Sequence, residues 1–326
     1  APLGPATSPL LGVAGVGLSL RLDAFSAVMF VLVAFVGAIV VQFSRNYMDG
    51  DDRQGAFMGG LCLTLAAVTL LILSGNLYHL VFAWIATSLA LHRLLLFYPD
   101  RPNARVAGRK KFVTARLGDV LLIGAAVMLA QAFATTDIAA ILDAARTAAA
   151  VGEVPAGVVP ATLLIAVAAL LKSAQFPTHG WLAEVMETPT PVSALLHAGI
   201  INAGGFLVVR FADVMLLSTS SLHVLAIVGG FTALFGSIVM LTQTSVKVSL
   251  AYSTVAQMGF MLLQCGLGAF TAAVLHIVAH SLYKAHAFLS SGSIIDLARA
   301  SWVPKAETRS RAGVLLASTA GAVAIF

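Results

Sequence analysis

The segment 275–288, LHIVAHSLYKAHAF, places three histidines and a lysine in an otherwise apolar run. His276, His280 and Lys284 recur every four residues, so on a helix that turns about 100° per residue they share one face, from which His286 diverges. Histidine exchanges protons near neutral pH, and burial favours the neutral form of lysine. The stripe therefore predicts a proton relay. A metal site is the weaker alternative, because no carboxylate or cysteine accompanies the histidines.

Other ionisable side chains also lie within or beside apolar runs, where a charge costs about 2.5–3.5 kcal/mol at the bilayer centre. Lys172, His197 and Lys247 are candidates for the same pathway, although Lys172 and Lys247 are also placed to extend toward a membrane surface. Candidate counter-charges or auxiliary groups are Asp119, His92, Arg93, Glu184 and Glu187.

The composition indicates which elements hold these groups. Only 10% of the residues are charged, against about 25% in soluble domains, and the mean hydropathy is +0.95. These values exclude an ordinary soluble domain and predict an all-α integral membrane protein, a polytopic bundle of about ten transmembrane helices. The distant Cys62 and Cys265 form no metal or disulfide framework, and we interpret the net charge of +5 as a topology signal rather than a nucleic-acid one.

Apolar runs define the expected helices, preceded by an extended or interfacial lead-in over the first 20 residues. We expect surface segments at 134–156 and 179–187, and a single membrane domain over 1–326 that is a portion of a longer chain. The expected helices cover 24–43, 55–75, 77–98, 112–133, 157–175, 190–212, 222–242, 248–268 and 270–295, with a tenth beginning near 312.

The stretch 172–197 breaks this pattern. It contains Pro177, Pro189 and Pro191, each of which removes a backbone donor and resists a continuous helix. Irregular backbone at membrane depth occurs where it lines a wet cavity, and broken helices of this kind mark ion sites in transporters. We predict a broken helix here, with an ordinary proline-rich loop as the alternative.

Basic residues are distributed unevenly between the expected loops. If the nine expected spans cross the membrane in alternating directions, thirteen of the nineteen lysines and arginines lie on one side of it. Only Arg21, Arg146 and Arg210 lie on the other side. By the positive-inside rule the rich side, including the loops 99–116 and 296–311, is cytoplasmic.

Several stretches together resemble a known family. LKSAQFPTHGWLAEVMETPTPVSALLHAGIINAGGFLVVRFADVM is similar to the signature of the antiporter-like proton-translocating subunits of respiratory complex I and of Mrp-type antiporters, and KKFVTARLGDVLL and VKVSLAYSTVAQMGFMLLQCGLGAF continue the match over nearly all of 20–300. The stretch AHSLYKAHAFLSSGS, with its extra histidine, is similar to the DabB membrane subunits of the DAB inorganic-carbon accumulation complexes.

This resemblance implies a multi-pass subunit of the bacterial inner membrane that conducts protons or another cation. Matching motifs place the pathway at Lys172, His197, His276, His280 and Lys284, with Lys247 matching a further family lysine. The expected partner is a DabA-like soluble subunit that resembles a zinc carbonic anhydrase. Catalytic residues, zinc and other cofactors are accordingly expected in that partner rather than in this chain.

One position departs from the complex I pattern, which places a glutamate after the tryptophan and pairs it with the lysine matching Lys172. Ile85 stands there. Lys172 is therefore expected to use Asp119, Glu184 or another acid, or to be neutral part of the time, with His92 and Arg93 as a replacement network. Three alternatives stay open: a pumping subunit of complex I or a related ferredoxin or hydrogenase complex, an Mrp-type sodium/proton antiporter subunit, and an inert membrane anchor.

Overall fold

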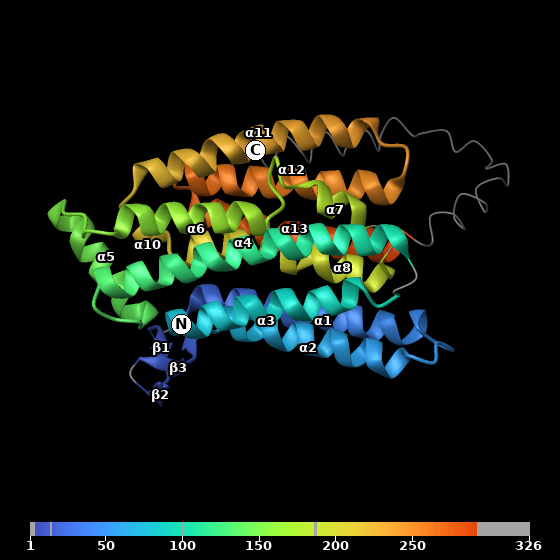
Figure 1. Ribbon diagram of the computed structural model, residues 1–326, viewed down its shortest axis with the longest axis horizontal. Helices are drawn as coiled ribbons and strands as arrows, with labels where there is room; N and C mark the ends of the chain where they lie inside the picture. The colour runs from blue at the N-terminus through green and yellow to red at the C-terminus, as the bar shows by residue number, and fades with distance from the viewer. Residues whose placement is uncertain (1–3, 14, 99–100, 186–187, 292–326) are drawn as a thin grey trace, which may run out of the picture. The chain divides into compact units, whose positions relative to one another are not determined.

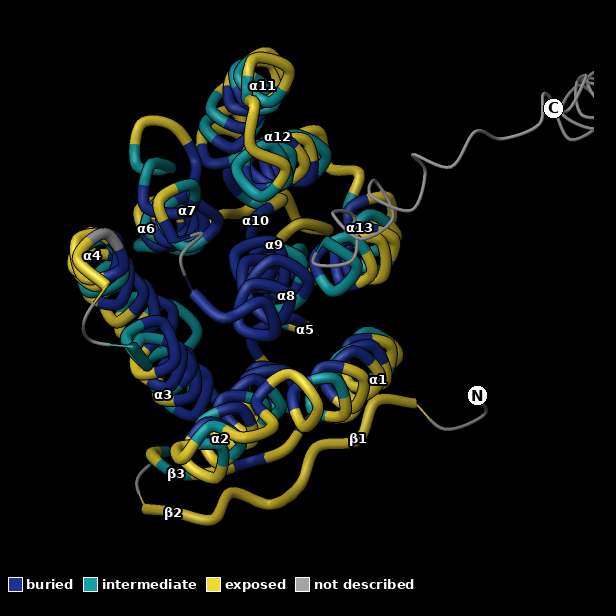
Figure 2. The backbone as a smooth tube through the Cα atoms, turned by 90° about the vertical axis from the view of Figure 1, so that its right-hand side faces the viewer, coloured by how far each residue is buried: buried dark blue, intermediate teal, exposed yellow. Residues whose placement is uncertain are grey.

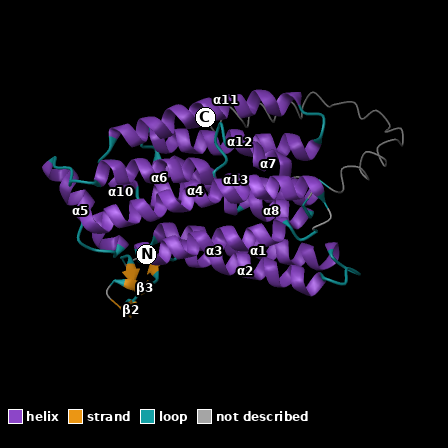
Figure 3. Cartoon of the chain, viewed as in Figure 1, coloured by secondary structure: helices purple, strands orange, loops and turns teal. Residues whose placement is uncertain are grey.

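The computed structural model describes residues 4–13, 15–98, 101–185 and 188–291, and it divides the chain into Ala1–Leu289 and Ser290–Phe326. Most of the second unit lies outside the described residues, and with it the expected tenth helix near 312 and the loop 296–311. The assignment of one domain to 1–326 therefore stays a prediction. In the first unit helices dominate, and strands are confined to the N-terminal lead-in (Figure 3).

The lead-in is extended, as its Pro- and Gly-rich sequence predicts. Strand β1 (Ala6–Thr7) pairs antiparallel with β4 (Arg21–Leu22), and β2 (Leu11–Val13) pairs with β3 (Val16–Leu18). The carbonyl of Ser19 accepts a hydrogen bond from the Gly75 amide at 2.9 Å and lies 2.8 Å from His79 Nδ1. These contacts fasten the lead-in to the start of the third helix.

Helices α1 (Ala24–Tyr47), α2 (Gln54–Ile72) and α3 (Leu77–Leu95) run in sequence, and α4 (Pro102–Ala132) follows. The side chains of Asp23 and Asn76 cap α1 and α3 by accepting backbone N–H groups of the first turn. The expectation of a loop over 99–116 is wrong, because α4 begins at Pro102. Proline suits the first helical turn, since it has no amide hydrogen that would be left unpaired there. Most of the basic stretch is therefore helical.

Helical structure in the middle of the chain is interrupted repeatedly. Amphipathic α5 (Ile138–Val151) precedes α6 (Val158–Lys172), and short α7 (Gly180–Glu184) follows an irregular stretch. The helix expected near 190–212 corresponds to the apolar stretch Thr190–Arg210, but its backbone breaks at Gly199. It is divided into α8 (Thr190–Ala198), the 3₁₀ turn η2 (Ile200–Asn202), α9 (Ala203–Arg210) and α10 (Ala212–Met215).

Helices α11 (Thr219–Thr242), α12 (Val246–Gly266) and α13 (Phe270–Ser290) complete the described chain. Figure 2 shows α8 and α9 in the middle of the first unit, buried and surrounded by the other long helices. The outer faces of α1 and α11 expose apolar side chains such as Phe35, Ile227 and Leu234. An apolar outer surface around a buried, broken helix fits a bundle whose surroundings are lipid.

Six stretches are long and apolar enough to cross a membrane among the described residues. Helices α3 and α13 are 19 and 21 residues long, but they carry the histidines, Arg93 and Lys284, which reduce their apolar character. The prediction of an all-α, polytopic membrane bundle is confirmed. The six stretches are Ala24–Tyr47, Gln54–Ile72, Ala104–Ala132, Thr190–Arg210, Thr219–Thr242 and Val246–Gly266.

Candidate functional site

The predicted stripe on α13 faces the interior of the bundle. His280 and Lys284 are buried, His276 is partly buried, and the rings of His276 and His280 are 6.1 Å apart. His286, which lies away from this stripe on the same helix, is exposed. His276 and His280 also line a groove of about 510 Å³ between α12 and α13 that opens to the surroundings.

The helix break at Gly199 links this stripe to α8. A helix leaves its last carbonyl groups without internal partners, and the carbonyl of His197 lies 3.2 Å from His280 Nε2. A carbonyl only accepts, so Nε2 is the donor and carries the proton in this arrangement. The bond therefore sets the protonation pattern of His280 as well as its position.

His197 is completely buried in this arrangement. Its Nδ1 lies 3.0 Å from Thr254 Oγ1 on α12, and its ring stacks on Phe288 with centroids 4.3 Å apart. Its Nε2 is buried and has no hydrogen-bond partner among the described residues. That nitrogen is available for a proton or a water molecule.

Lys284 is held by backbone rather than by an acid. Its Nζ donates to the carbonyl of Leu250 on α12 at 3.0 Å, and no described carboxylate lies within ion-pair distance. Lys247, one turn before Leu250, is partly buried, and its Nζ lies 3.4 Å from Thr190 Oγ1 at the start of α8. The structure thus places Lys247 at one end of the group formed by α8, α12 and α13.

Lys172 lies at the last residue of α6, against α3. Its Nζ is 4.3 Å from the centroid of the Trp84 ring and 3.5 Å from the Trp84 carbonyl. The Asp119 charge acts on Lys172, but the Asp119 carboxylate pairs with Arg116 at 2.6 Å. An aromatic face and a carbonyl thus contact the ammonium directly, and the acid acts from further away.

The remaining auxiliary candidates lie in different environments. Glu184 is exposed and pairs with Lys110 at 2.6 Å, so it does not face Lys172. His92 packs on Phe112 with ring centroids 5.1 Å apart, whereas Arg93 on the same helix is exposed. Glu187 lies outside the described residues.

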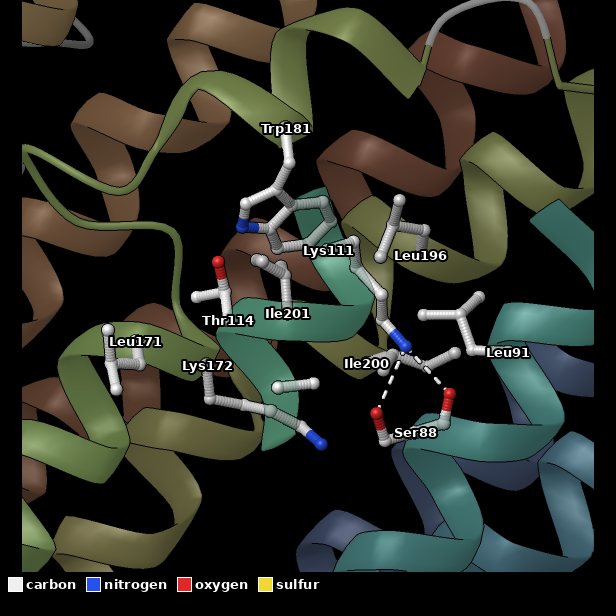
Figure 4. Close-up of a pocket in the computed structure, with 11 residues that line it drawn as sticks. Ser88, Leu91, Lys111, Thr114, Leu171, Lys172, Trp181, Leu196, Ile200 and Ile201 are labelled. Atoms are coloured by element: carbon white, nitrogen blue, oxygen red, sulfur yellow. Dashed lines mark hydrogen bonds between the residues drawn. The ribbon is translucent and has the colours of Figure 1, made fainter. Parts of the chain in front are cut away.

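Sequence reasoning missed Lys111, which was assigned to a loop. It is 5% exposed, and its Nζ donates to the carbonyl and the hydroxyl of Ser88 at 2.6 and 3.0 Å. Figure 4 shows Lys111 and Lys172 extending into one cavity of about 20 Å³, which Leu196, Ile200 and Ile201 also line. The available signal was the spacing of eight residues between Lys111 and Asp119, which places both on one helical face.

No cluster of three or more His, Cys, Asp or Glu side chains that would hold a metal ion occurs in the described part of the chain. Two sets of basic groups instead flank the broken helix: His197, His276, His280 and Lys284 on one side, and Lys111 and Lys172 on the other. The cavity of about 20 Å³ that Lys111 and Lys172 line has room for one water molecule.

Known proteins with similar sequences are membrane subunits. The family model described as NADH:quinone oxidoreductase/Mrp antiporter, TM matches residues 74–310, and that of the N-terminus of chain 5 of complex I matches residues 11–58. A probable inorganic carbon transporter subunit DabB2 from Halothiobacillus neapolitanus is 45% identical over 90% of this chain and 53% of its own. A probable DabB from Hydrogenovibrio crunogenus is 46% identical over 83% of this chain and 52% of its own.

Respiratory and antiporter proteins match as well. NADH-quinone oxidoreductase subunit L of Escherichia coli is 36% identical over 86% of this chain and 46% of its own. A structure of the Mrp complex from Dietzia superposes with a TM-score of 0.82 and 31% identity, covering 90% of this chain and 32% of that chain. The chain spans about half the length of the curated relatives it matches. It belongs to the family of NADH:quinone oxidoreductase and Mrp antiporter membrane subunits, as its motifs predicted.

Proposed function

We propose that the chain is the proton-conducting membrane subunit of an inorganic-carbon transporter in the bacterial inner membrane. In this proposal it couples an ion gradient to the uptake of CO2 or bicarbonate. The carbon chemistry takes place in a soluble, zinc-containing partner of the DabA type. The DabB relatives, which are named as probable inorganic carbon transporter subunits, support this branch of the family.

The observation that carries the proposal is the contact of His280 Nε2 with the His197 carbonyl across the broken helix. It places the stripe of titratable groups on α13 beside a buried histidine on α8 whose Nε2 has no partner among the described residues. Such groups are costly inside a membrane and mark ion pathways. Lys284, bonded to a carbonyl instead of an acid, is the next proton acceptor along the stripe.

The test uses the full-length protein together with its partner subunit. Replacing His280 by alanine or Lys284 by methionine removes a proton carrier, so we expect uptake of labelled inorganic carbon to fall by about 100-fold or more. His286→Ala is the matched control, because His286 lies on the same helix but is exposed. Partner co-purification measures assembly. Normal uptake by both assembled variants contradicts the relay.

A second candidate is a cation/proton antiporter or respiratory pumping subunit. The similarity to the Mrp complex structure, at 31% identity and a TM-score of 0.82, favours it. It predicts co-purification with redox subunits or sodium sensitivity on deletion, whereas the inorganic-carbon proposal predicts a zinc-containing soluble partner. Carbon uptake that is unaffected by an uncoupler favours instead an inert anchor.

A further inference from the structure

Lys111 is a buried lysine without an acid beside it. Its ammonium rests on the carbonyl and hydroxyl of Ser88, and none of the described carboxylates pairs with it. The preceding residue, Lys110, is exposed and paired with Glu184. Two adjacent lysines thus occupy opposite environments, and only Lys111 faces the cavity.

Lys172 lines the same cavity. Its Nζ lies 3.5 Å from the Trp84 carbonyl, and Trp84 and Ser88 are about one helical turn apart on α3. The cavity of about 20 Å³ has room for one water molecule.

The charges around the cavity do not balance when both lysines are protonated. Helix α4 contributes Lys111, Arg116 and Asp119, α6 contributes Lys172, and α3 contributes His92 with Ile85 at the family's acid position. The neighbouring part of α8 and η2 is apolar, and Asp119 is paired with Arg116. The charge of Lys172 acts on Lys111 across the cavity that both side chains line, and repulsion between like charges in an apolar site disfavours holding both. Releasing one proton removes that repulsion.

We propose that Lys111 and Lys172 form a proton-exchange pair that holds one proton between them and passes it through a cavity water. The ammonium of Lys111 gives a proton to the water, and the water gives one of its own to the neutral amine of Lys172. Charge and atoms are conserved in this step. This inference rests on the proposed proton conduction.

The decisive variant is Lys111→Arg. Arginine keeps the positive charge and the donors to Ser88, but it does not release its proton in proteins. We expect Lys111→Arg and Lys111→Met each to lower proton flux by about 100-fold in vesicles containing the full-length protein and its complex. The matched control, Lys110→Met, keeps wild-type flux. Wild-type flux in assembled Lys111→Arg overturns the pair, because a structural charge alone is then sufficient.

Lys111→His provides a second readout, which a purely structural role would not change. Histidine loses its proton near pH 6.5 and lysine near pH 10.4 in water, so the pH at which flux is half-maximal moves to lower values. An unchanged pH profile overturns the pair. The variants Lys172→Met and His280→Ala distinguish the two proposals. If proton flux is lost in these two variants but retained in the Lys111 variants, only the Lys111–Lys172 pair is overturned. If proton flux is retained in all variants, proton conduction by this chain is overturned.

Discussion

Asp23 joins three segments of the chain at a single carboxylate. It accepts from Arg21 Nε at 2.9 Å and from Arg210 Nη1 at 2.6 Å, and it caps α1 through the Ser26 amide. The Arg210 side chain is only 2% exposed and lies against the Phe206 ring. A buried charge whose partner is removed costs far more than a surface one. Asp23 therefore couples the lead-in, α1 and α9.

Replacing Asp23 by asparagine tests this coupling, because asparagine retains the capping ability and removes only the charge. We expect a loss of about 3 kcal/mol in stability at neutral pH, measured by thermal unfolding of the full-length protein. The exposed pair of Asp143 and Arg146 supplies the control. Asp143→Asn is expected to change stability by less than about 1 kcal/mol.

The contribution of Asp23 to the stability of the protein depends on pH, and the sign of this dependence follows from the pKa of its carboxyl group. Partial burial raises the pKa of Asp23, but the Arg210 charge and hydrogen bonds from Ser26 and Arg21 outweigh it and hold the pKa below its ordinary value. The stabilisation is therefore complete above the unfolded pKa of about 3.9 and is lost as pH falls below it. The difference in melting temperature between wild type and Asp23→Asn should be constant down to about pH 4 and then narrow. A difference that shrinks between pH 7 and 5 contradicts this.

Periodicity was sufficient to place His276, His280 and Lys284 on one buried face, because these positions depend only on the turn of a single helix. The burial of Lys111 was not predictable in this way. It depends on α4 beginning at Pro102 and on the packing of α4 against Ser88. A run of lysines and arginines read alone indicates a solvated loop, so its one buried member was missed.

At the scale of elements, the break at Gly199 shows where sequence patterns lose information. The prolines predict the irregular stretch before α8, but the apolar sequence of 190–212 predicts a single helix. Gly199 has φ −124° and ψ −73° at the break, but a single glycine inside an apolar run is tolerated within helices and does not by itself predict an interruption. Tertiary partners stabilise it instead: Ser173 Oγ donates to the Ile201 carbonyl at 3.1 Å, and His280 Nε2 donates to the His197 carbonyl.

Helices α11 and α12 approach each other through glycines, as is common between membrane helices. A Cβ at Gly259 would lie 2.5 Å from the Ala233 amide nitrogen and 2.7 Å from the Gly229 carbonyl oxygen. Both are backbone atoms and cannot move aside alone. The close packing matters for the site, because α12 supplies Thr254 and Leu250 to His197 and Lys284.

Gly259→Ala is therefore expected to separate α11 from α12 and to destabilise the protein by about 1–3 kcal/mol. Gly230→Ala is the matched control, since its Cβ would meet only the Leu263 side chain, with Cδ1 at 3.7 Å and Cδ2 at 3.9 Å. Thermal unfolding of the two full-length variants measures the difference. Equal melting temperatures would show that the helices do not pack as closely as described.

At the scale of the molecule, charge is distributed unevenly between the two ends of the bundle. The α1–α2 and α11–α12 connections lie at one end of the first unit, and the strands and α5 lie at the other (Figure 1). Arg45, Arg53 and Lys247 belong to the former end. The positive-inside rule therefore predicts that this end faces the cytoplasm. The helical start of α4 leaves this assignment intact, because Arg101 still precedes the helix at the same end.

Thiol labelling of intact cells tests this orientation. In a parent carrying Cys62→Ala, a cysteine replacing the exposed Asp52 should resist a membrane-impermeant reagent, whereas one replacing the exposed Glu153 should react. Permeabilised cells serve as the control, and both sites should react in them. The reverse pattern would place Lys247 and the end of the α13 stripe next to it on the outer side. It would thereby reverse the direction of the proposed proton movement along Lys284 and His280, so this measurement determines the sign of the proposed coupling.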